Sequence, residues 1–412
     1  MRLLKLEMKR VLKTRLTLIL LLLAIALSFL FAWLPTTFPY NSYTDAEGNQ
    51  VKLTGMESIE YKKKLQADIS GIVTPEKVRQ AVEKYQACLN KYGAETSYDL
   101  PEGIYDAEIL PYAPLLHGVR EAYVDPDTGI APSIMEIAPE KVNGFYDACR
   151  ERIASLMRME QKNHPAAQQR AIHLYDEVEK PYSVFPGLDR DAMDYQVILS
   201  FFILLFSAII AAPIFTSDFQ TGADDILRCT KYGRAKFAIT KIVSVLLICA
   251  VTYCLCAGIF LIITNSLWGW ECTKTSMQML YSIVNLPNMN IGQLQCFTAF
   301  SGLLCLLATI SFTLFLSTKF NNIAASSSVA LLFCILPIIV YMALPAQIGS
   351  LIYSILPSCG AALQASILYA AIDFDFWNIG SLAIWLPHVM LGACAVEIPL
   401  FTGLTVYSYS RR

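Results

Sequence analysis

Long apolar runs separated by polar stretches are the most regular feature of the chain. Residues 16–34 form an apolar run of about 19 residues, which is enough for a helix to cross a bilayer once. Five runs of comparable length follow in the second half of the chain. The pattern predicts an α-helical polytopic membrane protein with six transmembrane helices, at residues 16–34, 197–216, 237–264, 297–317, 323–344 and 382–407.

The composition agrees with this class. Hydrophobic residues make up 55% of the chain and charged residues only 16%, whereas about 25% of a typical soluble domain is charged. Residues 1–15 form a basic amphipathic stretch, in which Lys5, Lys9 and Lys13 recur every four residues. We expect this stretch to lie at the membrane surface as a helix. The apolar run after it is longer than that of a signal peptide and lacks a convincing cleavage site, so we expect a retained anchor.

Residues 35–196 are polar and contain no apolar run long enough to span a membrane. They contain 17 Lys/Arg and 26 Asp/Glu residues. Thr74 and Pro75 predict a helix start, with Thr as N-cap and Pro at the first helical position. Further helices are expected from Pro139 and over residues 166–179, whereas residues 98–132 are expected to be loop. The stretch therefore predicts a mostly helical extracytoplasmic domain between the first and second transmembrane helices.

Two cysteines of this domain, Cys88 and Cys149, lie on or beside the apolar stripes of two predicted helices. If these helices pack together, the thiols could form a disulfide on the oxidising side of the membrane. The alternative is a pair of buried free cysteines, and the sequence leaves both possibilities open.

The polar stretch at residues 217–241 is the longest charged stretch within the apolar second half. Acidic residues come first, basic residues come last, glycines interrupt it, and an Ile-Leu pair breaks the polar face. This order suits the dipole of a short amphipathic helix between two spans, which we expect over residues 217–236. The residues in question are Asp218, Gly222, Asp224, Ile226, Leu227, Arg228, Tyr232, Gly233, Arg234 and Lys241.

This stretch resembles the first cytoplasmic loop of ABC-2 type permeases, which are the membrane subunits of many ABC exporters. The resemblance depends on Asp218 and Gly222, then the Ile226-Leu227 pair, Gly233-Arg234 and Lys241. It implies that the loop is a coupling helix that seats in a groove of a separate ATPase subunit, and that the ten residues named above contact or support that subunit. The alternative is a solvated connector with ordinary positive-inside charge.

Basic residues orient the spans. Fourteen Lys/Arg residues lie in residues 1–15, 217–241 and 318–322 and the tail at 408–412, whereas the opposite short loops at 265–296 and 345–381 contain only Lys274. The positive-inside rule then predicts that both termini of this multi-pass protein are cytoplasmic. The resemblance to ABC-2 type permeases implies that the membrane is a bacterial plasma membrane.

The loop at residues 345–381 contains two apolar segments that are too short to span, at 347–356 and 359–372, with Pro357 between them. Such lengths suit re-entrant or interfacial helices, and ABC-2 permeases have a similar pair before their last span. The aromatic residues that follow are expected to form an interfacial belt: Phe374, Phe376, Trp377 and Trp385.

Catalytic and metal-binding motifs are absent from the sequence. It lacks a phosphate-binding P-loop, an H-E-x-x-H motif and a G-x-S-x-G motif, and its twelve cysteines include no C-x-x-C pair. We therefore expect no catalytic residue, no metal site and no cofactor bound by this chain. The resemblance implies that ATP and Mg²⁺ act through the partner ATPase subunit, and nothing points to nucleic acid.

One ionisable residue, Glu397, lies inside the last predicted span, with Pro399 two residues later. A carboxyl group there is costly and usually faces the bundle interior, a cavity or a partner. We expect a polar contact in the substrate path or at a subunit interface. The alternative is a protonated or locally paired Glu.

Two functions from different classes fit these observations. The first is the permease subunit of an ATP-driven exporter, which works with an ABC ATPase subunit and a second permease subunit, identical or not. The resemblance to this family implies an amphipathic substrate: a peptide, an antibiotic or a lipid. The second is a membrane-anchored extracytoplasmic sensor or assembly scaffold, which would not need the loop at 217–241 in this form.

Overall fold

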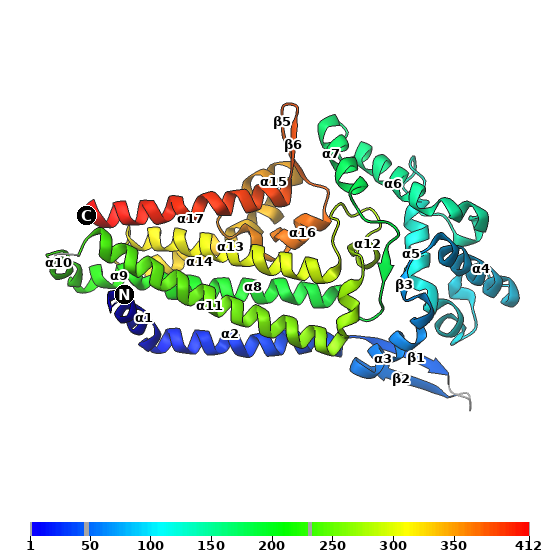
Figure 1. Cartoon of the computed structure of the whole chain (residues 1–412), viewed down its shortest axis with the longest axis horizontal. Helices are drawn as coiled ribbons and strands as arrows, with labels where there is room; N and C mark the ends of the chain where they lie inside the picture. The colour runs from blue at the N-terminus through cyan, green and yellow to red at the C-terminus, as the bar shows by residue number, and fades with distance from the viewer. Residues whose placement is uncertain (1, 45–48, 230–232, 412) are drawn as a thin grey trace.

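The computed structural model describes residues 2–44, 49–229 and 233–411. Six of the described helices are long and apolar enough to cross a membrane, and they lie side by side in one bundle (Figure 1). The chain is therefore an α-helical polytopic protein with little sheet. The six are α2 (Arg15–Trp33), α8 (Arg190–Ala211) with its continuation α9 (Pro213–Thr221), α11 (Ala235–Trp268), α13 (Ile291–Ser317), α14 (Ile323–Ala343) and α17 (Leu386–Arg411).

Several of these helices extend beyond the predicted apolar runs because capped polar turns precede them. The second span begins at Arg190 rather than 197, where the Asp189 side chain accepts a hydrogen bond from the Arg190 amide. The fourth begins at Ile291 rather than 297, behind a capping box formed by Asn290 and Gln293. The third covers 235–268 rather than 237–264. The last begins at Leu386, because residues 382–385 form a strand.

Both termini and the short helix α10 (Ala223–Arg228) lie at one end of the bundle, and the domain between the first two spans lies at the other end (Figure 1). Helix α1 (Arg2–Lys13) packs against α2 and α11 at the same end as α10 (Figure 1). Within the bundle, Asn265 and Gln295 exchange amide hydrogen bonds of 2.9 and 3.0 Å. This buried pair joins α11 to α13.

The intervening domain is mostly helical, as expected. Helix α4 begins as predicted: the Thr74 hydroxyl accepts a hydrogen bond from the Lys77 amide, Pro75 occupies the first turn, and Gly93 ends the helix with a φ of 64°. Residues 98–132 are not all loop, because Leu115, Leu116 and Val119 give α5 a buried face. The helices are α3 (Gly55–Leu65), α4 (Pro75–Tyr92), α5 (Ala113–Ala122), α6 (Phe145–Glu160) and α7 (Pro165–Asp176), with a 3-10 turn at Pro139–Gly144 before α6.

The strands are short and form three antiparallel pairs among the described residues. In the domain, β1 (Tyr40–Thr44) pairs with β2 (Gln50–Thr54), and β3 (Gly71–Ile72) pairs with β4 (Ser183–Val184). The third pair, β5 (Phe376–Ile379) and β6 (Leu382–Trp385), forms a hairpin directly before α17. This hairpin contacts α7 of the intervening domain.

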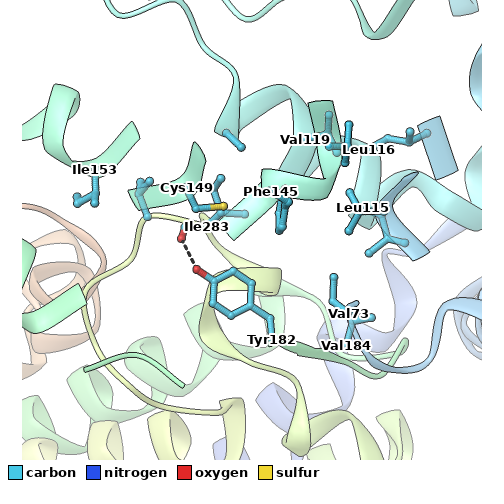
Figure 2. Packing of buried hydrophobic residues seen from close by; sticks show 14 of the residues in the cluster. Val73, Leu115, Leu116, Val119, Phe145, Cys149, Ile153, Tyr182, Val184 and Ile283 are labelled. Atoms are coloured by element: carbon cyan, nitrogen blue, oxygen red, sulfur yellow. Dashed lines mark hydrogen bonds between the residues drawn. The ribbon is translucent and has the colours of Figure 1, made fainter. Parts of the chain in front are cut away.

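The core of the intervening domain is shared with segments from the second half of the chain. The Tyr182 hydroxyl donates a hydrogen bond of 3.1 Å to the Ile283 carbonyl, and Ile283 packs beside Phe145 and Cys149 (Figure 2). Phe376 and Trp385 also belong to this core. Residues 35–196 therefore supply most of this core and segments from the second half complete it, and Phe376 and Trp385 are buried in it rather than exposed as expected for an interfacial belt.

The segment between α14 and the hairpin contains less helix than predicted. Helix α15 covers Ala346–Tyr353 and α16 covers Ile367–Ile372, whereas residues 359–366 form 3-10 turns with Leu363 at a φ of 49°. The expected helix over 359–372 is therefore reduced to its last turns. The loop between α11 and α13 contains the short helix α12, which covers Met277–Leu280.

Candidate functional site

The predicted amphipathic helix at 217–236 is in fact two helices that meet at a glycine. Helix α9 carries the second span through Asp218 to Thr221, where Gly222 adopts a left-handed φ of 68°. Helix α10 then occupies only Ala223–Arg228. Gly222 ends α9 because a residue without a Cβ adopts this conformation at little cost. Asp218 therefore belongs to the span and not to the loop.

The two apolar residues of α10 have different environments. Ile226 is 75% exposed, whereas Leu227 is partly buried against the core of the bundle. Asp224 is buried, Gly233 is buried and Arg234 is exposed. Tyr232 lies outside the described residues, and the structure describes no side-chain environment for Arg228. Ile226 is thus a large apolar side chain presented to the surroundings at the end of the bundle that holds both termini (Figure 1).

A buried ion pair anchors this end of the bundle. The Lys241 ammonium on α11 pairs with the Asp218 carboxylate on α9 and donates a hydrogen bond of 2.8 Å to the Ile214 carbonyl. The Lys241 side chain is 0% exposed and that of Asp218 is 7% exposed. The lysine nitrogen also lies 5.1 Å from the centroid of the Phe215 ring and 4.9 Å from that of Phe237. Two residues that the sequence assigned to coupling thus meet inside the protein, where they position α10 rather than offer a surface.

Helix α1 is tied to the same pair. Arg10 donates a hydrogen bond of 3.2 Å to the second oxygen of Asp218, and its other terminal nitrogen lies 3.2 Å from Glu7. Asp218 therefore accepts from two cations on two different helices. A charge-assisted network of this kind fixes the relative position of α1, α9 and α11.

A break in the second span allows α9 to turn toward this network. Pro213 starts α9 and supplies no amide hydrogen to the helix before it. The Ser317 hydroxyl on α13 accepts hydrogen bonds from the amides of Phe215 and Thr216 at 3.0 and 3.1 Å. A side chain from another helix thus satisfies the amides freed by the break. On the other side, the ring of Tyr409 on α17 lies 5.2 Å from that of Phe215.

Glu397 lies in the middle of the last span, as predicted, and is buried with an exposed fraction of 9%. Its Oε2 atom has no hydrogen-bond partner among the described residues. Glu397 interacts electrostatically with the Cys394 thiol, which in turn interacts with the thiols of Cys305 and Cys359. Pro399 lies within the same helix. No other carboxyl group within the described part of the six spans is buried without a partner in this way.

The two candidate disulfide cysteines are both free. Cys88 on α4 neighbours the Glu108 carboxylate, whereas Cys149 on α6 neighbours the Tyr175 hydroxyl. Burial raises the pKa of both thiols. Of the two possibilities left open by the sequence, the structure has the buried free thiols: the two helices share one core, but each thiol has its own polar neighbour.

Sequence reasoning missed Arg10, Ser317 and Tyr409, which all contact this end of the bundle. Pro213 was the one available signal, because a proline inside an apolar run predicts a helix break. In the described part of the chain, no group of three or more His, Cys, Asp or Glu side chains is placed to hold a metal ion. No protein-family model and no curated protein matches the sequence. The class that the fold defines is an α-helical polytopic membrane protein.

Proposed function

We propose that the chain is the permease subunit of an ATP-driven exporter and that the exposed side of α10 docks a separate ABC ATPase subunit. The observation that carries the proposal is Ile226, which is 75% exposed on a six-residue helix. A single exposed apolar side chain is common on protein surfaces, so Ile226 is informative because of its place in the charged loop between two spans. The loop sequence also resembles that of ABC-2 type permeases, as described above.

The anchoring of α10 supports a mechanical role. Asp218 and Lys241 join the helix before α10 to the helix after it, and both side chains are buried. A force applied at Ile226 therefore acts on α9 and α11 together. In the proposed function, closure of the ATPase moves α10, and the two spans tilt with it.

The proposed orientation places α10, α1 and both termini in the cytoplasm of a bacterium. Fourteen basic residues lie on this side and a single one in the opposite short loops, which is the asymmetry of a cytoplasmic face. The intervening domain is then extracytoplasmic. ATP and Mg²⁺ are bound by the ATPase, and this chain performs no catalysis.

A second permease subunit, identical or not, completes the pathway in this proposal, because six spans are few for a complete path. The substrate is amphipathic: a peptide, an antibiotic or a lipid. Glu397 and Pro399 are assigned to the pathway or to the interface between the subunits, since a buried carboxyl oxygen without a partner is available to a ligand.

Purification of the tagged chain from its own membranes in mild detergent tests the proposal. We expect a P-loop ATPase to co-elute with the wild type, and Ile226→Glu to lower its recovery at least about tenfold, because a charge replaces the central apolar contact. The matched control is Ile130→Glu, since Ile130 is 67% exposed but lies in the intervening domain. Equal recovery of the ATPase with both variants contradicts docking at α10. If no ATPase co-elutes with any form of the chain, the sensor or scaffold function is favoured.

A further inference from the structure

A cavity of about 560 Å³ opens in the intervening domain along one face of α6. Its volume lies within the range of small-molecule sites. Its charged and aromatic lining comes from α6, from the loop after α5 and from the 3-10 turn before α6. These lining residues are Tyr123, Asp125, Lys141, Glu151, Arg152 and Arg158.

The most informative group in this cavity is the Arg152 guanidinium. Its Nε and Nη1 atoms are buried, and neither has a hydrogen-bond partner among the described residues. Arg152 as a whole is partly buried, and buried guanidinium nitrogens without a hydrogen-bond partner are costly and uncommon in native proteins. Such a group indicates a site for an anion that is bound in the working protein.

The same helix provides an internal comparison. Arg150 lies two residues earlier and forms two hydrogen bonds with the Asp176 carboxylate, at 2.7 and 2.9 Å. Arg150 is thus a structural arginine with a fixed partner. Arg152 is buried more deeply than Arg150 but lacks a carboxylate within ion-pair distance among the described residues.

The other charges of the cavity leave Arg152 available. The Asp125 carboxylate accepts hydrogen bonds from the Asp127 and Thr128 amides at 2.8 and 2.9 Å, and these bonds lower its pKa. The Asp125 carboxylate is therefore already engaged by amides of its own loop. The Lys141 ammonium lies 5.1 Å from the centroid of the Tyr123 ring. Arg158 supplies a second guanidinium to the lining of the cavity, and it forms no ion pair in the described part of the chain.

We propose that this cavity binds a small organic oxyanion, a carboxylate or a phosphate monoester, through Arg152 and Arg158. Arginine suits such groups because its planar guanidinium donates several hydrogen bonds to their oxygens. Tyr123 and the alanine and proline side chains around the cavity form an apolar wall for the organic part. Nothing in this inference depends on coupling at α10, because the two sites lie at opposite ends of the molecule (Figure 1).

The probes that test the site are benzoate, phenyl phosphate and the neutral analogue benzamide, added to the full-length protein in detergent. We expect benzoate or phenyl phosphate at millimolar concentration to raise the melting temperature in proportion to its occupancy, and benzamide to have no effect. Whichever anion acts at the lower concentration identifies the carboxylate or the phosphate as the preferred group. A wild-type melting temperature that no anion changes overturns the proposal.

The variant Arg152→Met gives a signature that a purely structural arginine would not produce. Without probe we expect it to melt higher than the wild type, because two buried nitrogens without hydrogen-bond partners are removed. With probe we expect the apparent affinity to fall at least about tenfold. Arg150→Met is the control: it loses a salt bridge but should retain the full response to the anion. An unchanged anion response in Arg152→Met contradicts the assignment.

Two further variants keep the test valid if Arg152→Met does not fold. Arg158→Gln should weaken the anion response without lowering the melting temperature of the unliganded protein. Glu151→Gln should strengthen the response, because it removes the carboxylate that flanks Arg152 on α6. Opposite changes in these two variants support the site, and a null effect in both overturns it.

Discussion

Lys241 and Asp218 form an ion pair across two helices, with the lysine side chain completely buried and the carboxylate nearly so. Asp218 also accepts a hydrogen bond from Arg10, so the lysine depends on one acid while that acid has two cations. The ion pair joins α9 directly to α11, the helices on either side of α10. The position of Ile226 on α10 therefore depends on how these two helices pack in the bundle.

The unequal number of partners predicts unequal effects on stability. Asp218→Asn leaves the Lys241 ammonium buried without an anion, so we expect a loss of about 3–5 kcal/mol of unfolding free energy. Lys241→Met should cost less, because Asp218 keeps Arg10. The double variant should recover part of the loss. Unfolding in mixed micelles measures these values, with the exposed Lys9→Met as control; equal losses from both single variants would contradict the asymmetry.

Cys229 offers a test of orientation without added labels. It is exposed and lies directly after α10, whereas the other exposed cysteines, Cys254 and Cys296, lie on the long helices α11 and α13. We expect a membrane-impermeant maleimide to modify Cys229 in inside-out vesicles and not in intact cells. Cys229→Ser should abolish that signal. Modification of Cys229 from outside intact cells would reverse the proposed topology.

The thiols of the intervening domain should behave differently. Burial raises the pKa of Cys149 and keeps its thiol protonated, so we expect it to react with maleimide only after unfolding. After unfolding without reductant, both Cys88 and Cys149 should carry the label. Mass spectrometry of the labelled peptides is the measurement, and a linked Cys88–Cys149 peptide would restore the disulfide that the structure lacks.

Replacing Glu397 with an apolar residue should raise the stability of the protein. Its Oε2 atom is buried without a partner, so Glu397→Met should add about 1–3 kcal/mol. If the carboxyl group contacts substrate, the same variant should also lower substrate-stimulated ATPase activity of the assembled transporter. Val396→Met is the neighbouring control, because Val396 is 64% exposed on the same helix. A lower melting temperature in Glu397→Met would mean that a subunit or ligand pairs with this carboxyl group.

The attachment of the β5–β6 hairpin should weaken as the pH rises. Burial, the Asp375 carboxylate and Glu160 on α6 raise the pKa of Asp373 from 3.8 to about 6. The folded state therefore holds this proton more tightly than the unfolded state does. Its stabilising effect is complete below about pH 4 and is lost as the pH rises to about 6.

The variant that tests this pH effect is Asp373→Asn, which cannot lose a proton at this position. We expect slower amide exchange in the hairpin at pH 7 than in the wild type, and a difference that narrows at lower pH. Hydrogen exchange followed by mass spectrometry reports on residues 376–385 directly. Glu179→Gln, an exposed position on the same domain, should keep the wild-type pH profile. A constant difference across the pH range would exclude Asp373 as the titrating group.

Apolar runs were sufficient to locate all six membrane helices, because burial in lipid requires continuous hydrophobicity along the whole span. Helix ends were less predictable, since the polar first turns of α8 and α13 depend on caps at Asp189 and Asn290. The start of α4 was predictable because Thr74 and Pro75 act within one turn. Signals within a short stretch of sequence therefore predicted the features that depend on contacts within that stretch.

Long-range contacts could not be read from the sequence. Ser317 and Asp218 are separated by about a hundred residues along the chain, and only the packing of α13 on α9 brings them to the same end of the bundle. The sequence also gives no sign that the buried guanidinium nitrogens of Arg152 lack a partner. Arg150 is the same residue type two positions earlier, and it has a carboxylate partner. The sequence thus indicated the charged loop but not the side chains from other helices that anchor it.

The shared core of the intervening domain has a consequence for how the chain is made. Ile283, Phe376 and Trp385 complete that core, yet the ribosome adds them after every helix of the domain itself. From the end of α7 to the hairpin, synthesis adds about 200 residues, which takes about 10–40 s at the usual rate of elongation. During that interval the domain, which is translocated in the proposed orientation, has an uncovered apolar surface. Its maturation is therefore tied to insertion of the last span, and a nascent chain stalled before residue 376 should be a preferred substrate for chaperones and proteases.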